Sequence, residues 1–154
     1  MEKYKLSIKK QSSFNVINKE TNIAIIGLGY VGLPLAIEFG KIHNTVGFDV
    51  DQKRIEELNI FKDSTLSINS SQFQESNFLS FTSNKESIRA CNVYLVAVPT
   101  PLDNNNQPDL QSMQSACKLV GTMLNVGDIV VFESTVSPGA TEEFCVPILS
   151  QQSK

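Results

Sequence analysis

An apolar run that passes directly into three closely spaced glycines limits how this chain can fold more than any other feature. The run is Ile23–Ile26, and the segment Gly27–Gly32 follows it with the pattern Gly-Leu-Gly-Tyr-Val-Gly. A second apolar run, Thr45–Phe48, ends at the acidic residue Asp49. A buried strand, a Gly-rich turn, a helix and a second strand that ends in an acid about 20 residues further on form the dinucleotide-binding fingerprint. Because all these parts occur together, we interpret the glycines as a binding loop rather than as a tight turn without a ligand.

Each glycine of the loop has its own physical reason. Gly27 lets the chain turn sharply off the strand, where a side chain would strain the backbone. Gly29 lets the backbone approach a pyrophosphate, and Gly32 lets the next helix pack closely on the strand. The loop amides then point at the phosphates from the positive end of the helix dipole. The predicted pyrophosphate-binding residues are Gly27, Leu28, Gly29, Tyr30, Val31 and Gly32.

Asp49 predicts which dinucleotide binds. Its carboxylate, at the end of the second strand, can accept hydrogen bonds from the ribose hydroxyls of the adenosine half. Its negative charge would repel a 2′-phosphate. The predicted cofactor is therefore NAD rather than NADP.

Composition excludes several other classes of protein. The 154 residues suffice for one domain with its own core, and 41% hydrophobic and 19% charged residues are ordinary for a globular protein. A net charge of −3 and a pI near 5.1 argue against nucleic acid as a partner. No apolar stretch approaches the roughly 18 residues that span a bilayer, so we expect no membrane partner. The basic N-terminus lacks the apolar centre of a signal peptide, so we expect a cytoplasmic location.

The three cysteines give no metal site and no disulfide framework. Cys91, Cys117 and Cys145 are widely spaced, without a CxxC pair, and His43 is the single histidine. We expect the three thiols to pack as small apolar side chains.

Strand-like and helix-like segments alternate along the rest of the chain. We expect strands at 22–26, 45–48, 79–82, 92–98 and 129–133, and helices at about 31–42, 52–58, 83–90, 110–125 and 138–149. Ser83 to Glu86 has the spacing of a capping box, and Asp109 can cap the fourth helix. The order predicts an α/β fold, a Rossmann-type doubly wound parallel sheet in a single domain of residues 22–154. Residues 1–21 form an N-terminal extension whose role the sequence does not indicate.

Four segments, in order and spacing, resemble the UDP-glucose and GDP-mannose dehydrogenase family of nucleotide-sugar 6-dehydrogenases. They are Gly27–Pro34, Gly47–Asp49, Val98–Pro101 and Glu133–Glu143. The amino-acid sequences of the last two segments are most similar to those of the branch that acts on UDP-N-acetylhexosamines in surface-polysaccharide synthesis. The resemblance covers about residues 22–150.

The resemblance implies a role for each matching position. Gly27, Tyr30 and Val31 would bind the pyrophosphate through the backbone. Asp49 would bind the adenosine ribose, and Arg54 would lie against the same ribose and the adenine. The further residues implied are Val98, Pro99 and Thr100, at the ribose on the nicotinamide side, and Thr135, which would support catalysis by positioning the hydrolytic water. Glu133 would either orient its loop or touch a ligand.

The family oxidises the sugar C6 alcohol to a carboxylate with two NAD, through a cysteine thioester that water hydrolyses. This chain lacks the GlyGly-x-Cys-Phe-Pro-Lys-type segment and the sugar-binding domains, so none of its cysteines is assigned as the nucleophile. We expect it to be the N-terminal domain of a longer UDP-sugar dehydrogenase, a homodimer or higher, and to bind NAD without catalysing the reaction. Three alternatives remain: a stand-alone NAD-binding sensor or scaffold, another βαβ dehydrogenase of hydroxyacid or 6-phosphogluconate type, and a doubly wound domain without a ligand.

Overall fold

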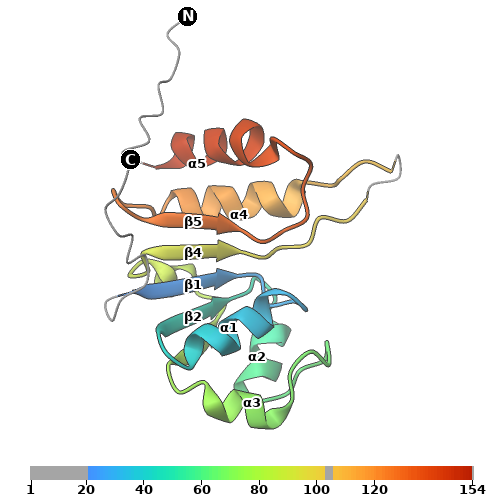
Figure 1. Cartoon of the computed structure of the whole chain (residues 1–154), viewed down its shortest axis with the longest axis vertical. Coiled ribbons are helices and arrows are strands. Elements are labelled where there is room, and N and C mark those ends of the chain that lie inside the picture. Colours follow the sequence, from blue (N-terminus) through green and yellow to red (C-terminus); the bar gives the residue numbers. More distant parts are fainter. Residues whose placement is uncertain (1–20, 103–105, 154) are drawn as a thin grey trace, which may run out of the picture.

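The computed structural model describes residues 21–102 and 106–153, and in them the strands form one parallel sheet (Figure 1). The strands are β1 (Asn22–Ile26), β2 (Asn44–Phe48), β3 (Leu79–Thr82), β4 (Val93–Val96) and β5 (Ile129–Phe132). Their order is β3-β2-β1-β4-β5, and every neighbouring pair is parallel. The chain builds outward from β1 to β3 and then crosses back to β4, so the order reverses between β1 and β4. The predicted doubly wound fold is confirmed, and all of the predicted extension except Thr21 lies outside the described residues.

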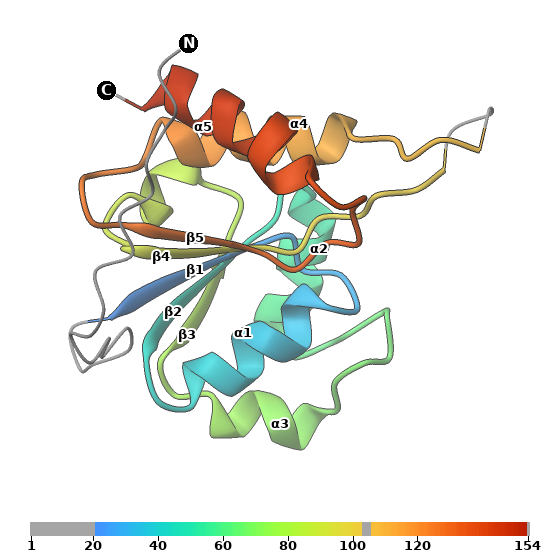
Figure 2. The same cartoon turned by 45° about the horizontal axis from the view of Figure 1, so that its top comes forward.

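Helices cover both faces of this sheet (Figure 2). They are α1 (Gly32–Gly40), α2 (Gln52–Asn59), α3 (Ser70–Glu75), α4 (Gln111–Gly121) and α5 (Val146–Gln152), with a 3₁₀ turn η1 (Lys85–Ile88) and a π turn η2 (Thr141–Cys145). None of the helices in the described part of the chain is long and apolar enough to cross a membrane.

The alternation of side chains along β1 explains why its sequence is apolar throughout. Ile23 and Ile25 pack with α1, α2 and α3 on one face of the sheet. Ala24 and Ile26 pack with α4 and α5 on the other face. A parallel strand that is covered on both faces needs apolar residues at every position, and this burial fixes β1 at the centre of the fold.

The three cysteines belong to the core, as predicted. Cys91, Cys117 and Cys145 are all free thiols and at most 4% exposed. Burial raises the pKa of Cys91 to about 11 and that of Cys117 to about 12. Thiols with such pKa values carry almost no thiolate at neutral pH, so they pack as apolar groups and are poor nucleophiles.

The predicted capping box at Ser83 is wrong. The Ser83 hydroxyl bonds the side chain of Gln52 on α2 instead. Asn84 caps the next turn, since its Oδ1 accepts from the Glu86 amide at 3.1 Å. A cap one residue later starts only the four-residue turn η1, not a helix that continues to Ala90.

Other element boundaries also differ from the prediction. Asp109 accepts from the Gln111 amide at 2.9 Å, but it lies one residue before the N-cap of α4, which is Leu110, and the helix spans Gln111–Gly121. Gly139 has a φ of +87°, which is incompatible with a right-handed helix, so the last helical segment begins at Thr141 rather than at Pro138. β4 and β5 each end earlier than predicted, which leaves residues 97–101 and 133–135 as loops at the carboxyl edge of the sheet.

Candidate functional site

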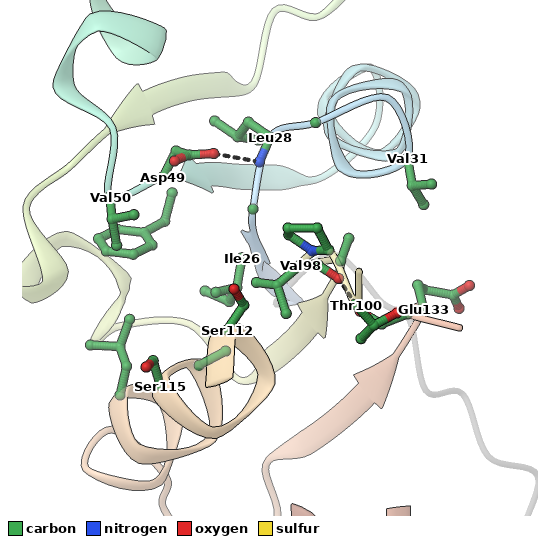
Figure 3. Close-up of a pocket in the computed structure, with 18 of the residues that line it drawn as sticks. Ile26, Leu28, Val31, Asp49, Val50, Val98, Thr100, Ser112, Ser115 and Glu133 are labelled. Atoms are coloured by element: carbon green, nitrogen blue, oxygen red, sulfur yellow. Dashed lines mark hydrogen bonds between the residues drawn. The ribbon is translucent and has the colours of Figure 1, made fainter. Parts of the chain in front are cut away.

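A pocket of about 920 Å³ lies at the carboxyl ends of β1, β2, β4 and β5, where the strand order reverses (Figure 3). Ligands bind at this position in open α/β sheets. Most of the predicted site residues line it: Gly27, Leu28, Gly29, Tyr30, Val31, Asp49, Val98, Pro99, Thr100 and Thr135. Gly32 and Arg54 do not, and the geometry below explains both.

Gly27 and Gly32 are required by the protein's own packing. Gly27 has a φ of +93°, and a Cβ on it would lie 2.9 Å from the Ala97 carbonyl oxygen. A Cβ on Gly32 would lie 1.8 Å from the Gly27 carbonyl oxygen. Gly32 therefore lets α1 pack closely on the glycine loop itself. It supports the loop without lining the pocket.

Gly29 differs from the other two glycines of the loop. Apart from its two chain neighbours, a Cβ built on it meets no atom of the described residues within 4 Å, and its φ is not positive. The described part of the protein therefore gives no packing reason for a glycine here. Open space over an exposed loop residue is what a closely approaching ligand needs, so the loop fits a dinucleotide pyrophosphate.

The Leu28 residue is fixed from both sides by charged side chains. Its N–H donates to Asp49 Oδ2 at 2.8 Å, and its carbonyl oxygen accepts from Arg54 Nε at 2.9 Å. Asp49 Oδ1 also accepts from the Asp51 amide at 2.9 Å. Each carboxylate oxygen can accept a second hydrogen bond, so Asp49 can serve the loop and still face a ligand in the pocket (Figure 3).

Arg54, which we expected against the ribose and adenine, lies behind the loop. Its side chain is 9% exposed, and Nη2 donates to Asp63 Oδ1 at 2.8 Å. Nη1 donates to the Ser64 hydroxyl at 3.3 Å. The contact between Arg54 and the site therefore passes through the Leu28 carbonyl.

The loops after β4 and β5 form the opposite wall and bond each other reciprocally. Thr100 Oγ1 donates to the Thr135 carbonyl oxygen at 2.7 Å. Ser134 Oγ donates to the Val98 carbonyl oxygen at 2.6 Å. Glu133 also lines the pocket, and its side chain is exposed. Its amide donates to the Val96 carbonyl oxygen at 2.9 Å and so continues the hydrogen bonding of the sheet.

Sequence reasoning missed the α4 side of the pocket. Ser112, Ser115 and Leu119 line it from α4, and Val50, Ser83 and Lys85 line it beyond β2 and β3. Met113 and Cys117 of the same helix belong to the hydrophobic core. The serines lie three residues apart in the first turns of the helix that follows β4, and this spacing of small polar residues was the available signal (Figure 3).

Comparison with known proteins agrees with this geometry. Residues 21–154 match the sequence model described as the UDP-glucose/GDP-mannose dehydrogenase family, NAD binding domain. The chain is 56% identical over 134 residues to the UDP-N-acetyl-D-glucosamine 6-dehydrogenase of Salmonella typhi, and 52% identical over 133 residues to that of Pseudomonas aeruginosa. These alignments cover 87% and 86% of this chain but 32% of each relative. The chain therefore spans about a third of the length of the curated relatives it matches.

A solved structure extends the similarity to three dimensions. The crystal structure of a ternary complex of GDP-mannose dehydrogenase from Pseudomonas aeruginosa superposes with a TM-score of 0.80 at 27% identity. The match covers 86% of this chain and 33% of that one.

Proposed function

Since this chain belongs to the UDP-glucose/GDP-mannose dehydrogenase family, as its NAD-binding domain, we propose that it supplies the NAD site of a UDP-sugar 6-dehydrogenase. In this proposal the whole enzyme oxidises the C6 alcohol of a UDP-N-acetylhexosamine to a carboxylate with two NAD. The 154-residue chain itself binds NAD and does not catalyse the reaction. NAD as the cofactor is supported at the level of the family.

The space over Gly29 carries the proposal. Gly27 and Gly32 are explained by close contacts within the protein, whereas among the described residues nothing approaches a Cβ on Gly29. A loop that is built from three glycines but needs only two for its own packing has left room for a ligand. The loop lies at the switch point of the sheet, at the start of α1, where the helix dipole favours a pyrophosphate.

The adenosine half would lie on the side of Asp49. Its carboxylate would accept from the ribose hydroxyls and would repel a 2′-phosphate, which gives the preference for NAD over NADP. Ser115 and Leu119 on α4 form the opposite side of the same pocket and would contact the adenine.

The nicotinamide half would lie on the side of the β4 and β5 loops. When bound there, NAD would accept the hydride from the sugar carbon. Val98, Pro99 and Thr100 would form the wall beside the ribose of the nicotinamide half, and Thr135 would position the water for hydrolysis. In this proposal none of the three cysteines would serve as the nucleophile, because all three thiols are buried and burial raises their pKa values.

Three further parts of the proposal come from the family resemblance and the sequence. The substrate is a UDP-sugar used in surface-polysaccharide synthesis, the whole enzyme is a homodimer or a higher oligomer, and it is cytoplasmic. The two UDP-N-acetyl-D-glucosamine 6-dehydrogenases at 52% and 56% identity support the choice of substrate class.

Calorimetric titration of the chain with NAD and, in parallel, with NADP tests the cofactor part. We expect binding of NAD with little response to NADP. Binding of neither ligand by a folded sample would contradict the proposal. A sensor or scaffold would also bind NAD, so the second arm assays NADH formation with UDP-N-acetylglucosamine in the native polypeptide that contains this domain; no turnover there would favour the sensor.

A further inference from the structure

A buried ion pair lies directly behind the glycine loop. The Asp63 side chain is fully buried and the Arg54 side chain is 9% exposed, with 2.8 Å between Arg54 Nη2 and Asp63 Oδ1. A buried charge pair is costly to desolvate and is tolerated where further hydrogen bonds satisfy both groups. Its position beneath a ligand-binding loop therefore calls for a reason beyond stability.

Asp63 is held rigidly by the turn that follows it. Oδ1 accepts from the Thr65 amide at 3.0 Å and from the Thr65 hydroxyl at 2.7 Å. Oδ2 accepts from the Ser67 amide at 2.8 Å and from the Ile68 amide at 3.0 Å. Burial alone would raise the pKa of Asp63, but the bonds from Thr65, Arg54 and Ile68 outweigh it and lower the pKa to about 2. The carboxylate is thus a fixed, charged acceptor with one direction left for the guanidinium.

The guanidinium of Arg54 transmits this fixed position to the loop. Its planar fork directs Nη2 at Asp63 while Nε donates to the Leu28 carbonyl at 2.9 Å. A lysine ammonium lacks the rigid fork that serves both partners at once. On the other side of Leu28, Asp49 accepts the amide at 2.8 Å. The two peptide planes that flank Leu28 are therefore fixed by Asp49 and by the Asp63–Arg54 pair.

We propose that Asp63 is a positioning residue for the pyrophosphate of NAD. It orients Arg54, Arg54 fixes the Leu28 carbonyl, and the loop amides that follow stay aimed at the phosphates before the ligand arrives. Asp63 and Arg54 are both absent from the pocket lining, so both would act on the ligand through the loop. This inference rests on the proposed NAD site, and it replaces the ribose contact expected for Arg54 with a contact through the backbone.

The test compares ligands that share the adenosine but differ in the phosphates. Asp63→Asn removes the charge and places an amide N–H₂ against N–H donors, and Arg54→Lys keeps the charge but loses the fork. Asp128→Asn is the matched control, because Asp128 Oδ2 also accepts a backbone amide, that of Asn125 at 2.8 Å, but at the amino end of the sheet. Each folded protein is titrated with NAD, ADP and adenosine, with NMR shifts as the readout for the weak ligands.

The expected result is a loss confined to ligands with a pyrophosphate. Asp63→Asn and Arg54→Lys should bind NAD and ADP about tenfold more weakly, whereas adenosine should change less than about twofold. Without ligand, amide hydrogen exchange should accelerate in residues 28–31 but not in β1. The Asp128→Asn protein should match the parent in every measurement.

Each contrary outcome is informative. Equal losses for adenosine and NAD would mean a direct ribose contact or general loosening, and would overturn the positioning role. Unchanged NAD affinity in both variants overturns it while leaving the NAD site intact. If Asp63→Asn fails to fold, Arg54→Lys alone decides. If the parent chain does not bind NAD, the proposed function fails first and the positioning role fails with it.

Discussion

The two walls of the pocket are built in different ways. The glycine-loop wall rests on charged side chains: Asp49 and Arg54 fix Leu28 from either side, and Asp63 fixes Arg54 from the core. The wall formed by the β4 and β5 loops rests on hydroxyls, with Thr100 and Ser134 each donating to a carbonyl of the other loop. A charge-assisted hydrogen bond is roughly twice as strong as a neutral one.

This difference matches what each wall has to do. The pyrophosphate is a fixed anionic group, and a rigid loop loses little entropy when it binds. The other wall would face the reacting sugar, and its two neutral bonds allow the loops to adjust. We therefore expect changes in the first wall to lower NAD affinity strongly and changes in the second wall to have milder effects.

The largest effect should come from Gly29→Val. The side chain would occupy the space left for the pyrophosphate, so NAD affinity should fall by more than about 100-fold, or about 3 kcal/mol. The fold should tolerate the change, because apart from the two chain neighbours no atom of the described residues lies within 4 Å of the new Cβ. Calorimetry with NAD measures the loss of affinity, and thermal unfolding checks that the fold is retained.

Gly27→Ala is the contrasting variant: its Cβ would clash with Ala97, so the free energy of unfolding should fall by about 2 kcal/mol. Retained NAD binding in Gly29→Val would falsify the role of the loop.

Asp49→Ala should have the next largest effect. It removes the acceptor for the Leu28 amide and the proposed acceptor for the ribose hydroxyls, so NAD affinity should fall by about 2 kcal/mol. Removal of the negative charge should also bring NADP closer to NAD in affinity. Parallel titrations with both cofactors measure the two changes. An unaltered ratio of the two affinities would remove Asp49 from the cofactor preference.

Low pH should weaken the ion pair behind the glycine-loop wall. The folded-state pKa of Asp63 is lowered from 3.8 to about 2, so its stabilisation is present above the unfolded-state pKa and is lost as the pH falls through about 2. We expect the free energy of unfolding to fall by about 2 kcal/mol from this group between pH 5 and pH 2. Urea unfolding across this range measures the change. The Asp63→Asn protein should show a correspondingly shallower decline; an identical decline would mean that Asp63 is not the group responsible.

The smallest effect should come from the wall formed by the β4 and β5 loops. Ser134→Ala and Thr100→Val each remove one neutral hydrogen bond between the loops, so each should lower NAD affinity by about 0.5–1 kcal/mol. The double variant should show coupling, because both bonds join the same two loops. Calorimetry on the two single variants and the double variant completes the cycle. A loss as large as that in Asp49→Ala would mean that the two walls are equally rigid.

The sequence predicted most of the fold because its signals are local. An apolar run that is buried on both faces, such as Ile23–Ile26, predicts a central parallel strand, and the glycine pattern after it predicts the turn and the helix. The same local logic placed Asp49 at the end of the second strand, whereas Val98, Pro99, Thr100 and Thr135 entered the predicted site through the family resemblance. It failed at Ser83, where either of two adjacent residues could cap the next turn. The Ser83 hydroxyl bonds the side chain of Gln52, and Asn84 is the capping residue.

The sequence by itself determined the succession of strands and helices along the chain, the binding loop and the acid at the end of β2, because each follows from the identities of neighbouring residues. Only the tertiary structure decided that Gly29 faces open space while Gly27 and Gly32 do not, and that Ser112 and Ser115 line the pocket. It also turned Arg54 away from the pocket and onto Asp63. These outcomes depend on which residues far apart in the chain become neighbours, and no local pattern encodes the direction of a long side chain that has partners on two sides.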